Sequence, residues 1–370
     1  GFATLVNSSG QSNTAVGSSA LNSNTTASNN TAVGYYALEA NTTGVENTAV
    51  GMHSLVNNTT AQSNSAVGYA SLVANTTGNY NSALGRHALS SNQTGNRNVG
   101  IGYYSLATNT ASDNTAVGYN SLCKNTTGTY NTALGTLALD ANITTNSNTA
   151  IGYAALGVNI ASNNTAVGTS SLDANTTGTT NVAVGVAALG ANTTGNQNTA
   201  IGNSALTANT TGSDNVVVGR NALDANTTAN YNTAVGSIAL GANITGCRNT
   251  AIGYATLNLN QTGNNNTAIG YAALNVNTGA NNTAVGKDSL IANTTGGGNT
   301  AMGLCALRTN TTASNNTAVG FCALTTNTVG FDNAAFGRSS LCLLTDGDYN
   351  TAIGSGSMAK TTTGLRNTAV

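Results

Sequence analysis

Apolar and polar positions recur along this chain with a period of 17 residues. The segment Asn-Thr-Ala-Val-Gly, or a close variant of it, begins at Asn13, Asn30 and Asn47 and continues to Asn367, with 22 starts in all. Three steps are 16 residues long, from 98 to 114, from 148 to 164 and from 266 to 282. A fixed period of this length is typical of stacked repeats. Each repeat is therefore expected to form one coil of a solenoid.

Within each repeat the pattern predicts a short strand over the motif and a second apolar position eight residues after the motif Asn. Alternation along a strand places the motif Thr and the aliphatic fourth residue, such as Val33, on one face and Ala32 on the other. Because Val99 stands where most repeats have Thr, we expect the Thr and aliphatic columns to face inward and the Ala column to face outward. The Leu column, which includes Leu38, is expected to be a further inward column.

The shorter repeats indicate where the coil turns. Two of them lose one residue near the second Asn-Thr, where Asn-Thr-Thr-Gly becomes Asn-Thr-Ala-Ser at Asn109 and Asn-Ile-Ala-Ser at Asn159. A turn tolerates such a deletion, whereas in a strand it would move every side chain to the opposite face. Recurrent Gly and Asn disfavour a helix. The sequence therefore predicts an all-β fold, a β-solenoid (β-helix or β-roll) of about 22 coils with 16–17 residues each, spanning 1–370 as a single continuous repeat domain.

The two ends of the sequence fit one another. The chain stops after Asn-Thr-Ala-Val at Val370, and its first residues, Gly1 and Phe2, match the two positions that come directly after this motif in other repeats. Joining Val370 to Gly1 would complete a whole number of repeats. We therefore expect either a segment of a longer array or a head-to-tail polymer, with its junction at Gly1, Phe2, Thr368 and Val370.

Composition narrows the function. Only 6% of the residues are charged and the net charge is −1, so no basic stripe is available to neutralise nucleic-acid phosphates. No apolar run approaches the length of a membrane span. The scattered acidic residues form no carboxylate pair, and no nucleophile motif is present. We therefore expect no enzyme activity, no cofactor, no nucleic-acid partner and no membrane insertion.

The repeat Asn-Thr-Ala-Val-Gly, followed by Tyr-x-Ala-Leu and Asn-Thr-Thr-Gly, resembles the repeats of bacterial and phage proteins of tail-fibre-like type. More distantly, its first part resembles the head repeats of trimeric autotransporter adhesins. The adhesin heads are left-handed parallel β-rolls packed as trimers, so this resemblance implies a β-roll and lateral self-association. The first likeness covers essentially the whole chain.

Modification and cross-linking sites are predicted at two places. Cys305 and Cys322 occupy the same column on adjacent coils and could form a disulfide. Asn-x-Thr sequons recur at the second turn, where a surface corner could carry glycans; the alternative is that these Asn serve hydrogen bonding within the turn. The candidate acceptors are Asn24, Asn41, Asn58, Asn75, Asn92, Asn125, Asn142, Asn175, Asn192, Asn209, Asn226, Asn243, Asn260, Asn293 and Asn310.

Aromatic side chains are a weaker signal. His53 and His87 lie two coils apart, too far for one metal ion, and are expected to be ordinary surface residues. Several Tyr follow the motif Gly and could form a strip that contacts carbohydrate or another chain. They are Tyr35, Tyr36, Tyr69, Tyr103, Tyr104 and Tyr119.

These observations favour a structural repeat protein, the shaft of an extracellular filament or fibre on a cell surface or virion, assembled from copies of itself by coil stacking. The alternative is a phage tail-fibre or adhesin shaft that binds a host surface through a separate tip. An ice-binding solenoid is a third hypothesis, because ladders of outward Thr can match ice. It is less favoured, since the adjacent Thr residues are expected at a corner.

Overall fold

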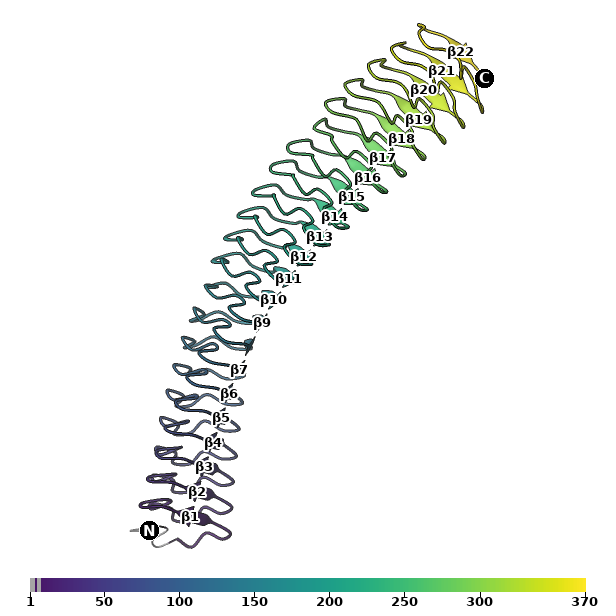
Figure 1. Ribbon diagram of the computed structural model, residues 1–370. Coiled ribbons are helices and arrows are strands. Elements are labelled where there is room, and N and C mark those ends of the chain that lie inside the picture. The colour runs from purple at the N-terminus through teal and green to yellow at the C-terminus, as the bar shows by residue number, and fades with distance from the viewer. Residues whose placement is uncertain (1–3, 5–7) are drawn as a thin grey trace. The chain divides into compact units, whose positions relative to one another are not determined.

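The computed structural model describes Thr4 and residues 8–370. By its internal contacts the chain divides into two compact units, Gly1–Asn181 and Val182–Val370, hereafter unit 1 and unit 2. Each unit is described by itself. Both are stacks of coils with one three-residue strand per coil, except for a two-residue last strand (Figure 1). No helix occurs in the described part of the chain. The predicted all-β solenoid is therefore confirmed.

The described residues of unit 1 form ten strands that pair in chain order, each parallel to the next and in register. They are β1 (Thr14–Val16), β2 (Thr31–Val33), β3 (Thr48–Val50), β4 (Ser65–Val67), β5 (Ser82–Leu84), β6 (Val99–Ile101), β7 (Thr115–Val117), β8 (Thr132–Leu134), β9 (Thr149–Ile151) and β10 (Thr165–Val167).

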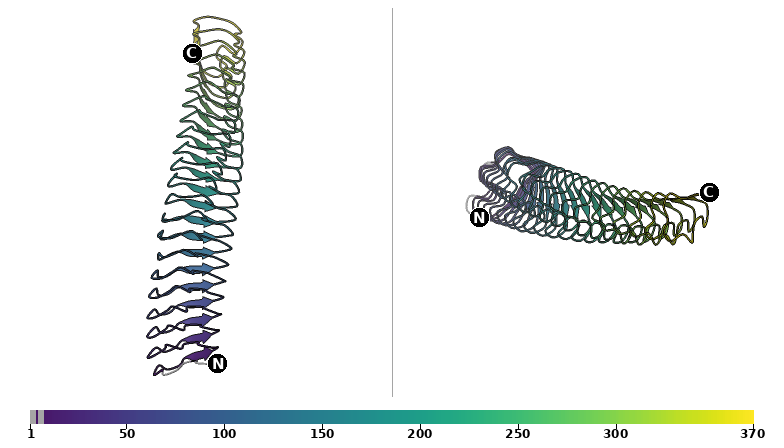
Figure 2. Two further views of the ribbon diagram at one scale, coloured as in Figure 1. Left: turned by 90° about the vertical axis from the view of Figure 1, so that its left-hand side faces the viewer. Right: turned by 90° about the horizontal axis from the view of Figure 1, so that it is seen from above.

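Unit 2 repeats this arrangement with twelve strands, and in each unit the strands lie in one file on one side of the coils (Figure 2). They are β11 (Val182–Val184), β12 (Thr199–Ile201), β13 (Val216–Val218), β14 (Thr233–Val235), β15 (Thr250–Ile252), β16 (Thr267–Ile269), β17 (Thr283–Val285), β18 (Thr300–Met302), β19 (Thr317–Val319), β20 (Ala334–Phe336), β21 (Thr351–Ile353) and β22 (Thr368–Ala369).

Hydrogen bonds between coils are not confined to the strands. The amide of Leu38 donates to the carbonyl of Ser54 on the next coil at 3.1 Å, and the amide of Thr42 donates to Thr59 at 2.9 Å. The amide of Glu46 donates to a carbonyl of the preceding coil at 3.2 Å. Backbone groups outside the strand are thus also satisfied by neighbouring coils, which allows a three-residue strand to sustain a stable stack.

Sharp corners require unusual backbone conformations. Each full coil turns at left-handed residues, as at Tyr36 (φ 58°), Leu38 (φ 53°) and Glu46 (φ 60°). The motif Gly has φ near +135°, where side chains are strained, and it also lies close to the next coil. A Cβ added to Gly202 would lie 2.6 Å from the carbonyl oxygen of Gly219. Only Gly fits this position.

The buried face of the strand is the opposite one from the sequence-based prediction. The central Ala of each strand is buried, for example Ala200 and Ala251 at 0% exposure, and the Thr and aliphatic columns face outward. The predicted inward Leu column is confirmed, since Leu38 is fully buried. The interior has little room beside this Leu: a Cβ at Gly100, which replaces Ala in β6, would lie 3.1 Å from Cγ of Leu89. The narrow coil therefore takes mostly the methyl group of Ala at this strand position, and Val217 of β13 is the one larger side chain there among β1–β22.

The 16-residue coils keep the strand register. Val99 pairs with Thr115 and Thr165 pairs with Thr149 across the shortened steps, as do Thr267 and Thr283. In the first of these coils the corner is changed instead: the side-chain amide of Asn109 donates to the carbonyl of Ala111, two residues on rather than three. The deletion is thus absorbed at the predicted corner.

Candidate functional site

The outward face of the strands is a regular surface built from two columns, which we call the sheet stripe. One column is the first strand residue, usually Thr, and the other is the third, an aliphatic residue or Phe336. The aliphatic column is well exposed, with Ile201, Ile252 and Ile269 at 40%, 39% and 38%. No charged residue stands at either outward position of β1–β22. The sheet stripe is therefore uncharged and about half apolar along β1–β22.

The column before the motif Asn borders the sheet stripe and differs from it in character. It is variable and carries charge, for example at Glu46 and at Arg97, whose guanidinium forms an ion pair with Asp113 at 2.6 Å. The hydrogen bond from Arg97 holds the pKa of the Asp113 carboxyl below its usual range. The sheet stripe therefore has a variable, partly charged rim along one side.

The corner Asn side chains are inside the coil, where they form a ladder. The Nδ2 of Asn41 donates to Oδ1 of Asn24 on the preceding coil at 3.2 Å and to the carbonyl of Gly44 at 2.9 Å. Asn58 continues the ladder by donating to Oδ1 of Asn41 at 2.9 Å. The fifteen predicted glycan acceptors are all at most 1% exposed.

This burial corrects the expectation that the corner Asn lie on the surface. Both amide protons of Asn41 are used in hydrogen bonds, and its side chain has no contact with solvent. A glycan on such a nitrogen would remove one of these protons and would have no space. The physical reason is that buried backbone carbonyls at the corner need donors, which the Asn amides supply. The alternative role in turn hydrogen bonding fits the structure.

The motif Asn forms a second buried ladder. The backbone amide of Asn47 donates to Oδ1 of Asn30 at 2.9 Å, and Nδ2 of Asn47 donates to the carbonyl of Ala61 at 2.8 Å. Each side chain therefore links a neighbouring coil to a carbonyl at a corner. Two Asn ladders thus run inside each unit and fix the spacing and register of its coils.

Interruptions of the corner ladder leave unpaired acceptors. Among the described side chains, Oδ1 of Asn92 and Oδ1 of Asn327 are buried without a hydrogen-bond partner. Asn92 precedes the shortened corner at Asn109, and Asn327 precedes Leu344, which replaces the ladder Asn and is fully buried. A buried unpaired acceptor destabilises a fold by about 1–3 kcal/mol, so these two corners are weaker than their neighbours.

Eight rings in unit 1 form a continuous aromatic ridge over six coils. Tyr36 and His53 stack at 5.5 Å between ring centroids, His87 and Tyr104 at 5.1 Å, and Tyr103 and Tyr119 at 5.5 Å. The ridge comprises Tyr35, Tyr36, His53, Tyr69, His87, Tyr103, Tyr104 and Tyr119, joined by edge contacts between the stacked pairs.

The two His fill gaps in the Tyr series, a role that the sequence pattern alone does not indicate. Each lies one position after the column of Tyr69, on the coil before or after it. The guanidinium of Arg86 also lies over the rings of Tyr69 and Tyr103, at 5.5 and 5.9 Å from their centroids. Burial, and then the charge of Arg86, lowers the pKa of His87. Such ring contacts contribute about 0.5–1.5 kcal/mol each, so the ridge stabilises unit 1 locally.

The Cys residues are free thiols. Cys305 and Cys322 lie on adjacent coils as predicted, and burial, followed by the neighbouring Cys322, raises the pKa of the Cys305 thiol. Their disulfide stays a prediction. Cys123 donates to Asp140 at 3.0 Å, and burial together with this contact raises its pKa to about 12. The Cys123 thiol is therefore protonated at neutral pH and is a poor nucleophile.

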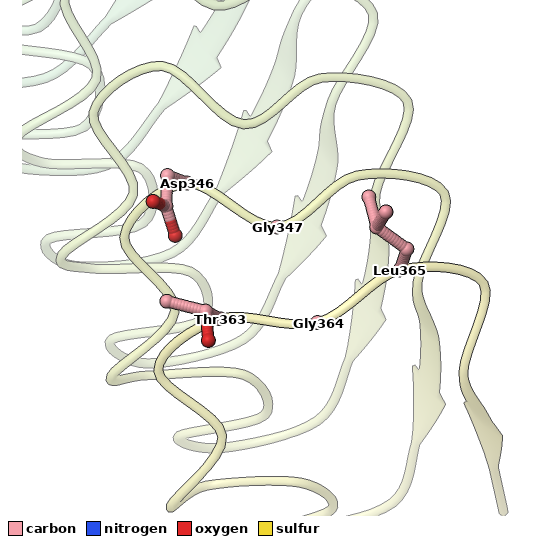
Figure 3. A pocket seen from close by; sticks show the side chains of 5 residues that line it. All are labelled: Asp346, Gly347, Thr363, Gly364 and Leu365. Atoms are coloured by element: carbon pink, nitrogen blue, oxygen red, sulfur yellow. The ribbon is translucent and has the colours of Figure 1, made fainter.

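Concave and metal-binding features are sparse. One hollow on unit 2 is lined by Gly347, Gly364, Asp346, Thr363 and Leu365. Figure 3 shows the side chains of Asp346 and Thr363 at one end of it and Leu365 at the other. Asp346 is its only ionisable lining residue, so this hollow lacks a convergent set of polar groups. Among the described residues, no three His, Cys, Asp or Glu lie close enough to hold a metal ion.

The junction residues predicted from the two ends are only partly described. Gly1 and Phe2 lie outside the described residues. Thr368 begins β22, which pairs with β21, and Val370 is 95% exposed. Over the range that the structure covers, no helix is long and apolar enough to cross a membrane.

These features define a protein class by fold, a parallel β-solenoid with one short strand per coil of about 17 residues. Comparison with protein-family models and with curated proteins found no match to this chain. The surface features above therefore carry the functional argument.

Proposed function

We propose that this protein is a structural repeat protein that forms the shaft of an extracellular filament or fibre, assembled from copies of itself. The observation that carries the proposal is the sheet stripe. Within unit 2 its twelve strands, at about 4.8 Å each, present a face of roughly 600 Å², if the stripe is about 10 Å wide. About half of this face is apolar, and an apolar area of roughly 300 Å² is at the lower end of the largest exposed patches on soluble monomers.

A second copy is the partner that fits this face. Its own stripe has the same coil spacing, so side-chain columns on the two faces can interdigitate along their whole length. The uncharged centre and the charged rim at Glu46 and Arg97 match the usual anatomy of a protein interface. Coils of separate copies can also stack end to end, because neighbouring coils within each unit are joined by the same hydrogen bonds.

Charge placed on the sheet stripe is expected to abolish lateral association. The variant Ile201→Lys with Ile252→Lys and Ile269→Lys should run as single rods in analytical ultracentrifugation and electron microscopy, with an unchanged melting temperature. The physical reason is that three unpaired ammonium groups cannot be buried between two sheets.

A matched control places the same charge elsewhere on unit 2. Val186, Leu259 and Leu304 lie outside the strands and are exposed by 50%, 47% and 40%. Replacing all three by Lys should leave association intact. Equal association of the stripe variant and the wild type would contradict lateral assembly through this face.

Ice binding is a second candidate function. One structural observation supports it more strongly than the sequence pattern does. The Thr column faces outward beside the aliphatic column, rather than inward, and both repeat in register on a parallel sheet. Monodisperse protein should then depress the freezing point below the melting point in a thermal hysteresis assay, and the Lys variant of the stripe should not. Absence of hysteresis in the wild type would exclude this candidate and leave the filament proposal untouched.

A further inference from the structure

Six Asn-Asn-Thr segments place a second kind of sequon on the surface of the coils. In five of them the first Asn directly precedes the motif Asn, so the sequon is Asn29-Asn30-Thr31 or its equivalent. All five first Asn are exposed, whereas the fifteen corner Asn are buried. They are Asn29 and Asn163 in unit 1 and Asn265, Asn281 and Asn315 in unit 2.

The backbone of these segments presents both sequon side chains on the outside. Asn29 is exposed, Asn30 is fully buried, and Thr31 is half-exposed on β2. The main chain at Asn29 is held in place because its amide donates to the carbonyl of Gln11 at 3.0 Å, with φ at 62°. The same exposed, buried and half-exposed order holds in the other four segments.

The side-chain amides of these five Asn are unengaged. None of them makes a hydrogen bond to another residue of the described chain. Asn57 provides a contrast, because it also heads an Asn-Asn-Thr sequence and is exposed, but its Nδ2 donates to the carbonyl of Val73 at 2.8 Å. A substituent on the amide of Asn29 would therefore break no contact of the fold.

We propose that Asn29, Asn163, Asn265, Asn281 and Asn315 are the N-glycosylation sites of this protein. The inference rests on the proposed extracellular role, since glycan transfer from lipid carriers takes place outside the cytosol. The donor is a glycan linked to a lipid pyrophosphate. The Asn amide nitrogen forms a bond to the anomeric carbon, the bond from that carbon to the phosphate oxygen breaks, and the amide proton passes to the released phosphate.

Two of the sites are too close to be filled together. Asn265 and Asn281 lie on consecutive coils, whose strands β16 and β17 pair directly, so their backbones are about 4.8 Å apart. A branched glycan on one would cover the other. Each chain is therefore expected to carry a glycan on one of these two residues and not on both.

The primary test is glycopeptide mass spectrometry on the native protein. Glycan is expected on peptides that contain the five exposed Asn, and none on peptides that contain only corner Asn such as Asn41. Glycan on the corner Asn, or five bare sites, would overturn the inference. Filaments whose five sites are bare would leave the fibre role standing, whereas native protein found only as single rods would count against the fibre role whatever its glycan content.

Two single substitutions in the Thr column, expressed in the native host, supply a matched pair of variants that tests the third sequon residue. Thr317→Val removes the sequon of Asn315 and should lose one glycan mass, while Thr300→Val, in the same column on the preceding coil, should lose none because Gly298 holds the acceptor position. Val fits this column, as Val182 and Val216 show, so both variants should fold. Equal glycan content in the two variants would contradict the assignment.

Discussion

Replacing Gly202 by Ala is expected to destabilise unit 2 by more than about 3 kcal/mol, because two unfavourable effects coincide at this residue. Its φ of +137° strains any side chain. An added Cβ would also lie 2.6 Å from the carbonyl oxygen of Gly219, a backbone atom that cannot move without breaking the bonds between two coils. The measurement is chemical denaturation combined with amide hydrogen exchange, which should report fast exchange in the coils around β12.

Two other glycines serve as controls for this prediction. Gly190 has no positive φ, and Ala107 occupies the equivalent place on another coil, so Gly190→Ala should change the free energy of unfolding by less than about 1 kcal/mol. Gly354 has a positive φ of 117° but no atom within 4 Å of an added Cβ, so Gly354→Ala should have an intermediate effect. If all three variants were equally stable, the close approach of neighbouring coils would not explain the recurrent motif Gly.

Removal of one rung of the corner ladder is expected to have the second largest effect. Asn58→Ala deletes the donors to Oδ1 of Asn41 and to the carbonyl of Ala61, and the acceptor for Nδ2 of Asn75. All these groups are buried, so we expect a loss of about 2–4 kcal/mol and faster hydrogen exchange in the coils on both sides.

The neighbouring residue is the natural comparison. Asn57 is exposed and has one hydrogen bond, to the carbonyl of Val73, so Asn57→Ala should lower stability by less than about 1 kcal/mol. Two variants of similar stability would mean that the ladder contributes little beyond the backbone bonds.

The coil and its length are predictable from the 17-residue period of the sequence, and the corner is predictable from the repeats that are one residue shorter. The Leu column is also predictable, since a large apolar residue that hardly varies is typical of a core. Which face of the strand points into the coil is not predictable in this way. Val99 and Val182 in the Thr column suggest core residues, whereas Val is also favoured on the exposed face of a sheet. A better signal is the central column, which holds only Ala, Gly100 and Val217 and is typical of a narrow interior.

The candidate site is less predictable because exposure at the corners depends on single residues. Asn29 and Asn30 are identical in type and adjacent, yet one faces solvent and the other is buried. The sequence does carry a signal for the difference: the position of Asn29 is Glu46, Tyr80 or Arg97 in other repeats, as expected for a surface column, whereas the position of Asn30 is always Asn. The aromatic ridge is hard to predict in full, because His residues suggest metal ligands before they suggest partners of Tyr rings.

The constant register across 16- and 17-residue coils has a consequence for the gene. Because Val99 and Thr115 pair as regularly as any 17-residue neighbours, unequal recombination between repeats yields a coil with an intact strand even when one corner residue is lost. Related genes can therefore differ in the number of coils, so that the stack changes in whole-coil steps while the register of its strands is kept.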